Sequence, residues 1–444
     1  MTCDNGRPVR FGLDFGTSNS ALAVADGGAP RVLPLDPLAG ETMPTILYVR
    51  RDGSPLVGRP AIEAYLADER ARGPVRRRVK LIGVRMASSD PEQPTVEAHI
   101  LADVDAPGRL FQSLKSFLGS PLDSPTSVFG TPMTLTALVA VILEHVRRRA
   151  VELTGEAPGE IGIGRPVEFI GGPSAEALAL SRLEEAARLA GFRSIRFEYE
   201  PVAAARAAGV GEGRTLVFDF GGGTLDLCVV ERRGDRVAVV ATAGRGVGGD
   251  RFTQVLIDLL VAPRLGADAR WGPKRLRLPA FIVNAISDWH ALSALNEKPI
   301  LDALDDLVRA GAPRRELATL RSAIELQLGY EIFAAVDATK CDLSVEDAGL
   351  LTFHRAEVDI DAVVPRRRFE LKAGPLLRQI DDLLTEVLAR AGVEASSMDE
   401  VVLTGGSSAM PAARSLLARR FPDALMRDAA AFSSVAAGLA LRAA

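Results

Sequence analysis

Two stretches of this chain follow the same pattern, and this repeat limits the possible folds more than any other feature. Residues 12–20 read GLDFGTSNS and lead into the apolar run 21–24. Residues 217–226 read VFDFGGGTLD and lead into the apolar run 227–230. Each stretch is a short apolar strand, an Asp-Phe-Gly turn, a hydroxyl residue and a second apolar strand, followed by another turn and a third strand. Self-similarity on this scale indicates a duplicated domain.

The turns of the repeat suit a bound phosphate chain. Glycine permits the positive φ angles and the close approach that let backbone N–H groups point into a concavity. Asp14 and Asp219 stand at strand ends, where a carboxylate can hold Mg²⁺ directly or through its waters. Thr17 and Thr224 add hydroxyl donors for phosphate oxygens. One such turn alone is more typical of an ordinary β-hairpin, but two turns with equivalent Asp and Thr residues indicate phosphate binding.

Helical and strand patterns alternate along the rest of the chain. Helices are predicted at residues 134–153, 174–190, 202–208, 250–261, 374–391 and 411–420, with a mostly helical stretch at 313–346. Further strands are predicted at residues 192–198 and 401–404. This alternation favours an α/β protein of two related lobes. Residues 66–108 and 263–312 show no pattern that relates to chemistry, and we interpret them as insertions or a mobile subdomain.

Composition excludes several kinds of partner. The 444 residues are 47% hydrophobic and 25% charged, which is typical of a soluble protein with a sizeable core. The net charge is −4, and the arginine clusters at 76–78, 147–149 and 366–368 are short. We therefore expect neither nucleic acid nor a membrane as the main partner. The apolar stretch at 135–143 is far shorter than the ~20 residues that a membrane helix needs.

The cysteines and the N-terminus favour a cytoplasmic location. Cys3, Cys228 and Cys341 are far apart in the sequence and belong to no CxxC motif. Neither a disulfide framework nor a zinc site is therefore expected, and a reducing compartment fits best. The N-terminus lacks a basic stretch followed by an apolar core, which argues against a secretory signal.

A competing motif lies at residues 244–249, where GRGVGG satisfies GxGxxG. Asp268 follows it about twenty residues later, as a dinucleotide-binding fingerprint requires. The preceding strand at 237–243 belongs to a meander, however, and not to the start of a βαβ unit. We therefore do not expect a dinucleotide site, and the chain contains no GxxxxGK[ST] motif either.

Several motifs together resemble the seventy-kilodalton heat-shock (DnaK-type) protein family. The segments that resemble its two phosphate motifs, its connecting helix and its adenosine motif are 13–20, 219–224, 200–205 and 403–408 with Pro411. Gly248-Gly249-Asp250 and the segment 340–344 also fit. The phrases at 115–119, 163–167 and 197–201 are similar to a shorter branch of the family, the YegD type. The motifs come in the family's order and span the chain from residue 9 to nearly its end.

The resemblance implies a two-lobed actin-like ATPase fold built from duplicated ribonuclease-H-like domains. The first lobe is expected to comprise residues 1–208 plus 424–444, and the second residues 209–423. Each lobe would carry one of the two insertions. No C-terminal peptide-binding domain is expected, because the chain ends where the nucleotide-binding fold should close.

The resemblance also implies roles for the matching residues. Asp14 and Asp219 would organise Mg²⁺ and its waters, and Lys115 would stabilise charge on the γ-phosphate. Positioned charge of this kind is an adequate catalytic set for phosphoryl transfer. The expected catalytic residues are Lys115, Glu200, Asp219 and Thr224. The other expected nucleotide contacts are Gly16, Thr17, Ser18, Asn19, Gly221, Gly222, Gly223, Gly248, Gly249, Lys340, Ser344, Gly405, Gly406 and Ser407.

Three details of the resemblance stay open. Lys80 lies in a phrase that also resembles the family's lysine motif, although the residues before Lys115 fit better. Ala409 stands where the family usually has an arginine that stacks on adenine, which makes adenine selectivity less certain than phosphate binding. Asp337 stands where a longer glutamate would normally reach the ribose.

These features favour a slow ATPase or ATP-gated switch that binds ATP or ADP with Mg²⁺ and signals to a separate protein partner. One alternative is a small-molecule kinase of the same fold, but we identify no catalytic aspartate beside an acceptor pocket. Another is an actin-like assembly protein. Against it, Lys115 and residues 337–344 fit the chaperone family, and the long insertions should hinder stacking.

Overall fold

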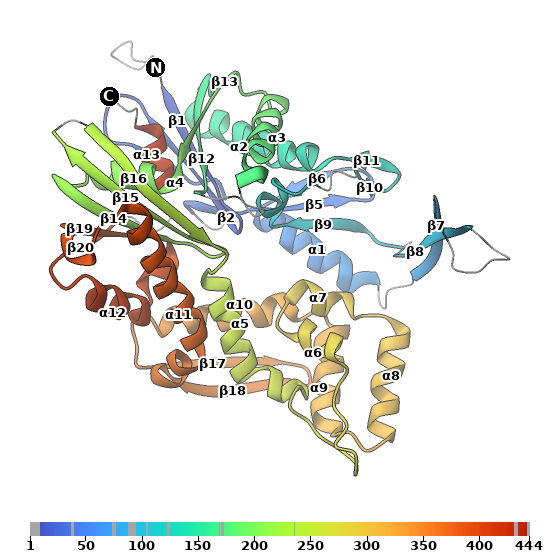
Figure 1. Ribbon diagram of the computed structural model, residues 1–444. Helices are drawn as coiled ribbons and strands as arrows, with labels where there is room; N and C mark the ends of the chain where they lie inside the picture. The colour runs from blue at the N-terminus through green and yellow to red at the C-terminus, as the bar shows by residue number, and fades with distance from the viewer. Residues whose placement is uncertain are drawn as a thin grey trace.

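The computed structural model describes residues 9–36, 40–72, 77–87, 95–103, 105–121, 125–167, 169, 173–234, 236–429 and 434–441. Two β-sheets, each covered by helices, form two lobes (Figure 1). Among these residues, no helix is both long and apolar enough to cross a membrane.

The first sheet contains the first copy of the repeated hairpin. Its strand order is β13-β12-β1-β2-β3, with β4 beside β2. The strands are β1 (Arg10–Phe15), β2 (Asn19–Ala25), β3 (Arg31–Leu33), β4 (Thr42–Pro44), β12 (Glu160–Arg165) and β13 (Ser194–Tyr199). The helices that pack on this sheet are α2 (Leu135–Thr154), α3 (Pro173–Leu189), α4 (Glu200–Ala208) and α13 (Ser434–Ala440).

Alternate residues of β1 face different helices, as the two-residue period of a strand requires. Leu13 and Phe15 are fully buried in the core formed with α2 and α3. Gly12 faces α13, where an added Cβ atom would lie 2.2 Å from the carbonyl oxygen of Ala436. Only glycine at this position therefore allows α13 to pack directly on β1.

The second sheet repeats the plan of the first. Its strand order is β16-β15-β14-β19-β20. The strands are β14 (Gly213–Phe220), β15 (Leu225–Arg233), β16 (Arg236–Arg245), β19 (Glu400–Thr404) and β20 (Leu425–Asp428), and the covering helices include α5 (Gly249–Leu260), α11 (Arg366–Ala391) and α12 (Pro411–Arg420). As in the first sheet, an antiparallel hairpin adjoins a parallel strand. The prediction of a duplicated, actin-like α/β fold is confirmed.

Two predicted boundaries differ from the observed elements. β20 pairs in parallel with β19, so residues 425–428 form a strand of the second sheet, whereas the predicted boundary between the lobes lies at residue 424. The helix predicted at 374–391 begins at Arg366, although Pro375 lies inside it. Phe369 and Ala373 pack into the second-lobe core, and this burial outweighs the local effect of a proline in the helix.

The segment 263–312, which showed no interpretable pattern in sequence, is largely helical. Its elements are the 3₁₀ turn η2 (Ala262–Leu265), α6 (Ala280–Ile286), α7 (Trp289–Ala294) and α8 (Lys298–Arg309), followed by α9 (Arg314–Glu325). Ile282, Leu301 and Leu304 are buried in the second-lobe core. α6 and α7 are short, so their local periodicity is weak and tertiary burial defines them. α8 does have a helical apolar pattern, with Leu301, Leu304 and Val308 on one face, which the sequence interpretation overlooked.

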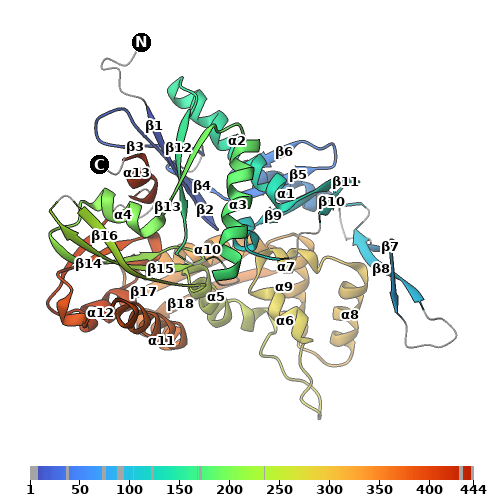
Figure 2. The same ribbon diagram turned by 45° about the horizontal axis from the view of Figure 1, so that its top comes forward.

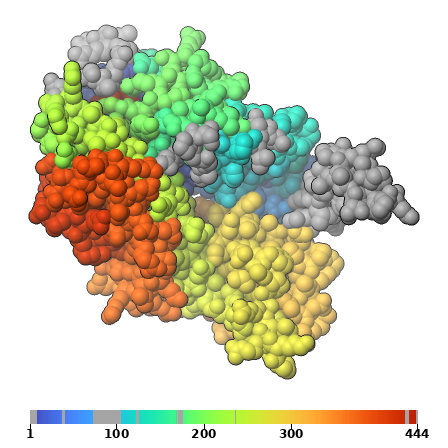
Figure 3. Space-filling view, viewed as in Figure 1, coloured from blue at the N-terminus to red at the C-terminus, as the bar shows by residue number. Residues whose placement is uncertain are grey.

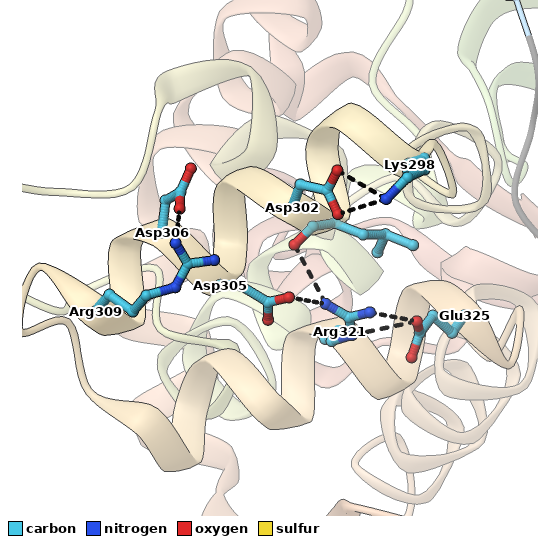
Figure 4. Close-up of polar contacts among 8 residues, drawn as sticks. Lys298, Asp302, Asp305, Asp306, Arg309, Arg321 and Glu325 are labelled. Carbon is cyan, nitrogen blue, oxygen red and sulfur yellow. Dashed lines mark hydrogen bonds and ion pairs between the residues drawn. The ribbon is translucent and has the colours of Figure 1, made fainter.

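One ion pair connects α8 to α9 on the surface of this segment. Arg321 donates from Nη1 to Asp305 at 2.8 Å and to the Leu301 carbonyl oxygen at 3.2 Å (Figure 4). Its remaining nitrogens donate to Glu325 of its own helix. Exposed pairs of this kind contribute little individually, but this arginine spans two helices and fixes their spacing.

The segment 66–108 begins inside a helix and continues into a hairpin. Its elements are the end of α1 (Arg59–Arg72), β7 (Arg77–Ala87) and β8 (Thr95–Asp103). Figures 1 and 2 both show this hairpin projecting from the first lobe, away from β1 and β14. Lys80 lies on β7, and its side chain is outside the described part of the chain.

The remaining elements connect these parts. They are β5 (Ile46–Arg50), β6 (Pro55–Val57), β9 (Gly108–Gln112), β10 (Thr126–Val128), β11 (Thr131–Met133), β17 (Ala348–Arg355), β18 (Val358–Pro365), α10 (Gly329–Asp342) and the 3₁₀ turns η1 (Leu114–Phe117), η3 (Ala395–Ser397) and η4 (Gly406–Ala409). Cys228 and Cys341 are free thiols, and Cys3 lies outside the described residues.

Candidate functional site

The two repeated hairpins face each other across a cleft between the lobes. The water-accessible volume of the cleft is about 240 Å³. Most of the predicted site residues line it, namely Asp14, Gly16, Thr17, Ser18, Asn19, Lys115, Glu200, Asp219, Gly221, Gly222, Gly223, Thr224, Lys340, Ser344, Gly405, Gly406 and Ser407. Residues from distant parts of the chain therefore meet at one site.

Close approach to neighbouring atoms, and not an unusual backbone angle, favours glycine at Gly16, Gly222 and Gly223 of the hairpins. None of Gly16, Gly221, Gly222 and Gly223 has a positive φ angle. An added Cβ at Gly16 would lie 2.1 Å from the Asn19 carbonyl oxygen. At Gly223 it would lie 3.3 Å from the Cβ of Thr17 in the opposite hairpin. A side chain at Gly16 would distort its own hairpin, and one at Gly223 would crowd the opposite hairpin.

Gly248 and Gly249 lie behind the second hairpin and are not among the residues lining the cleft. The N–H groups of Gly249 and Asp250, at the start of α5, donate to the carbonyl oxygens of Gly221 and Gly222 at 3.0 and 2.9 Å. An added Cβ at Gly248 would lie 2.1 Å from the Gly222 carbonyl oxygen. These glycines therefore support the hairpin, and Gly249, the last glycine of the GxGxxG phrase, has a structural role that needs no dinucleotide.

Four carboxyl groups and one lysine gather at the floor of the cleft. The Nζ atom of Lys115 lies 2.5 Å from Oε1 of Glu200, and the two residues are only 6% and 7% exposed. Asp226 is also buried, and its Oδ1 accepts a 3.4 Å hydrogen bond from the Val167 N–H. Asp14 and Asp219 complete the group from the ends of β1 and β14.

The burial and close spacing of these side chains shift their pKa values. Burial, together with the nearby Glu200 carboxylate, raises the pKa values of Asp14 and Asp226 to about 7. Burial and Asp226 raise the pKa of Asp219 well above its ordinary value. Burial lowers the pKa of Lys115, but the Glu200 and Asp14 carboxylates outweigh this effect and raise it overall.

A divalent cation fits this group of residues. Near neutral pH the carboxyl groups must either hold protons or share additional positive charge. Carboxylate oxygens are the ligands that Mg²⁺ prefers, and the ion usually retains several waters in such sites. Asp14 and Asp219 face the cleft from opposite lobes, so an ion held there would connect the two hairpins.

The predicted adenosine residues Lys340, Ser344, Gly405 and Gly406 line the same cleft. Lys340 donates from Nζ to Thr253 at 2.9 Å and to Asp337 at 2.6 Å, and Asp337 also lines the cleft. Gly405 has a φ angle of 78°, and an added Cβ would lie 2.3 Å from the carbonyl oxygen of Phe220. Ala409 is exposed and absent from the described lining.

The sequence did not predict some of the residues that line the cleft. They are Ser20, Ala21, Thr42, Asp226, Asp250, Cys341, Thr404, Met410, Ser434 and Val435. Asp226 and Asp250 could have been found, since both lie in the quoted motifs. Ser434 and Val435 carry no local signal, because only the packing of α13 brings them to the cleft.

The lobes are also joined outside the floor of the cleft. Tyr65 of α1 makes an edge-to-face contact with Trp289 of α7, with ring centroids 6.2 Å apart. Trp289 also contacts Tyr330, at 5.3 Å, and Arg70 forms an ion pair of 2.5 Å with Glu331. We call these five residues the interlobe clasp. Figures 1 and 2 both show α1 beside α7.

A family model described as Hsp70 protein matches residues 10–264 and 326–444. The matched ranges contain both hairpins and every predicted site residue. The interval between them holds α6 to α9, including Trp289 of the clasp. Figure 3 shows this interval in yellow to light orange, below the cyan and green surface of the first lobe.

Proposed function

The chain belongs to the Hsp70 family, and on that basis we propose that it is an ATP-gated switch. In this proposal it binds ATP or ADP with Mg²⁺, hydrolyses ATP slowly, and transmits the closure of its lobes to a protein partner. The YegD-like phrases at 115–119, 163–167 and 197–201 favour that branch of the family. The free thiols of Cys228 and Cys341 agree with a cytoplasmic location.

The observation that carries the proposal is the group of buried carboxylates facing two glycine hairpins. Asp14 and Asp219 would hold Mg²⁺, which would neutralise charge on the phosphates and orient them. Thr17 and Thr224 would donate their hydroxyl groups to phosphate oxygens. Lys115 would shift its Nζ from Glu200 toward the γ-phosphate as charge develops there, which leaves the Glu200 carboxylate free to orient a water molecule.

The sheet packing supports a division into lobes that can move against each other. α13 packs against β1, β2 and α4, so we assign the chain after β20 to the first lobe with residues 1–208. The second lobe then runs from 209 through β20. The Ser18 hydroxyl donates to Asp250 at 3.1 Å across the cleft, so separation of the lobes would break this bond and the clasp together.

Two measurements on the full chain test this function. Isothermal titration with Mg-ATP, Mg-ADP and Mg-GTP measures nucleotide affinity and base selectivity. Release of phosphate from γ-labelled ATP measures hydrolysis. Binding of ATP that weakens when EDTA removes Mg²⁺, together with slow phosphate release, is the expected result. If neither affinity nor hydrolysis is found, the proposal fails.

The interlobe clasp should control how fast the nucleotide leaves. We expect Trp289→Ala to speed the release of fluorescent ADP about 2- to 10-fold, because the Tyr65–Trp289 contact that crosses between the lobes, of about 0.5–1.5 kcal/mol, is lost. Stopped-flow displacement by unlabelled ATP measures the rate. Phe281→Ala is the control, since Phe281 lies in the same segment, on α6, but is 56% exposed. An unchanged release rate in Trp289→Ala would show that the clasp does not restrain opening.

A further inference from the structure

Lys115 is carried by a segment with little structure of its own. The 3₁₀ turn η1 has four residues and follows Ser113, whose φ and ψ angles of 55° and 28° are left-handed. Non-glycine residues adopt this conformation at a cost, and it persists only where the surroundings impose it. Short 3₁₀ turns also have poor hydrogen-bond geometry. The position of Lys115 therefore depends on contacts from outside the turn.

Two kinds of contact hold this segment. Leu114 and Leu118 are buried in the first-lobe core, where α3 contributes Ala179 and Leu183. Arg182 of the same helix, only 5% exposed, donates from Nη1 to the carbonyl oxygens that follow the turn. These are Leu118 O at 2.8 Å and Ser120 O at 2.7 Å. Hydrogen bonds from a charged donor are stronger than those between neutral groups.

The hydrogen bonds continue from Arg182 toward the lysine. The Leu118 N–H donates to the Lys115 carbonyl oxygen at 3.2 Å. The peptide groups on both sides of Leu118 are therefore held, one by Arg182 and one by Lys115 itself. From this backbone the Lys115 side chain reaches Glu200, 2.5 Å from its Nζ atom.

We propose that Arg182 is a positioning residue for Lys115. It fixes the backbone after η1 and so directs Nζ to Glu200 and, during hydrolysis, to the γ-phosphate. The inference rests on the proposed function for its catalytic consequence, but the effect on the position of Lys115 is separate from it. Apolar packing by Leu114 and Leu118 sets the depth of the turn, whereas Arg182 sets its orientation.

Kinetics of an arginine variant provide the first test. We expect Arg182→Met to lower the rate of ATP hydrolysis about 10- to 100-fold, since small displacements of a catalytic group have effects of this size. The Kd for Mg-ATP should change much less. Arg182→Lys should recover part of the rate, because an ammonium group can still bond one carbonyl. Arg147→Met is the matched control, since Arg147 of the same lobe also donates to a carbonyl, that of Ala190, at 2.7 Å.

A double-mutant cycle separates positioning from general damage. If Arg182 acts through Lys115, adding Arg182→Met to Lys115→Ala should cause no further loss of rate. Independent, multiplicative losses would overturn the inference, as would full activity of Arg182→Met.

Chemical labelling gives a readout that does not require hydrolysis. Lys115 should react slowly with acetic anhydride in the wild-type chain and several-fold faster in Arg182→Met, measured by peptide mass spectrometry. Lys298, whose side chain is 80% exposed, is the internal reference. Equal labelling of Lys115 in both chains would overturn the inference. If the wild-type chain shows no hydrolysis, the catalytic part of the proposed function fails, while labelling still decides the role of Arg182.

Discussion

Replacing Lys115 with alanine should lower the rate of ATP hydrolysis about 100- to 1000-fold, the usual effect of removing one positioned donor from a developing charge. Lys115 and Lys340 are the cations among the described residues that line the cleft, and only Lys115 contacts the carboxylates on its floor. Affinity for Mg-ATP should fall much less, because the hairpins and Mg²⁺ would still hold the phosphates. Single-turnover phosphate release and isothermal titration measure the two effects.

Lys80→Ala is the control for this prediction. Lys80 lies in the other phrase that resembles the family's lysine motif, but it is placed on the projecting hairpin β7–β8. Its replacement should leave hydrolysis unchanged. Loss of activity in Lys80→Ala with retention in Lys115→Ala would reverse the assignment.

The Lys115→Ala replacement should also lower the stability of the fold. Without Lys115, Glu200 is left buried beside three aspartates. Removing one partner of a buried ion pair typically lowers the free energy of unfolding by about 3–5 kcal/mol. The double variant Lys115→Met with Glu200→Gln should therefore unfold at a higher temperature than Lys115→Ala while remaining inactive.

Replacing Gly248 with alanine should weaken Mg-ATP binding about 100-fold. The new Cβ would lie 2.1 Å from the Gly222 carbonyl oxygen and 2.5 Å from the Gly223 carbonyl carbon, so the second hairpin must move. Loss of two hydrogen bonds to a charged phosphate, at about 1.5 kcal/mol each, corresponds to this change in Kd. Isothermal titration measures it, and circular dichroism reports whether the fold is retained.

Gly246→Ala is a close control, two residues away in the same GxGxxG phrase. Gly246 has no positive φ angle, and an added Cβ meets no other atom within 4 Å. Its replacement should leave binding unchanged. Equal losses in both variants would mean that the phrase contacts the nucleotide itself or that its backbone must stay flexible.

The repeated hairpins show what local sequence can determine. A strand, an Asp-Gly turn and a second strand depend on residues a few positions apart, so β1–β2 and β14–β15 follow directly from the pattern. The helix α12 (Pro411–Arg420) matches its predicted limits, and the proline at its first position is a local start signal. The early start of α11 and the short helices α6 and α7 did not follow, because burial of residues such as Phe369 and Ile282 decides them. The apolar face of α8 was present in the sequence but was not recognised.

The assembly of the cleft was decided by tertiary structure alone. The sequence determined which residues are suited to phosphate and Mg²⁺, because carboxylate, hydroxyl and glycine have that chemistry wherever they stand. It could not determine that Asp226 lies beside Glu200 and Lys115, or that the packing of α13 places Ser434 in the cleft. Nor could it determine that Arg182 bonds the backbone after η1. These pairs are far apart in the chain, and only the packing of two sheets and their helices sets the distances between them. The same holds for Gly223. An added Cβ there would crowd Thr17 of the opposite hairpin, and this neighbour is not part of the local sequence pattern.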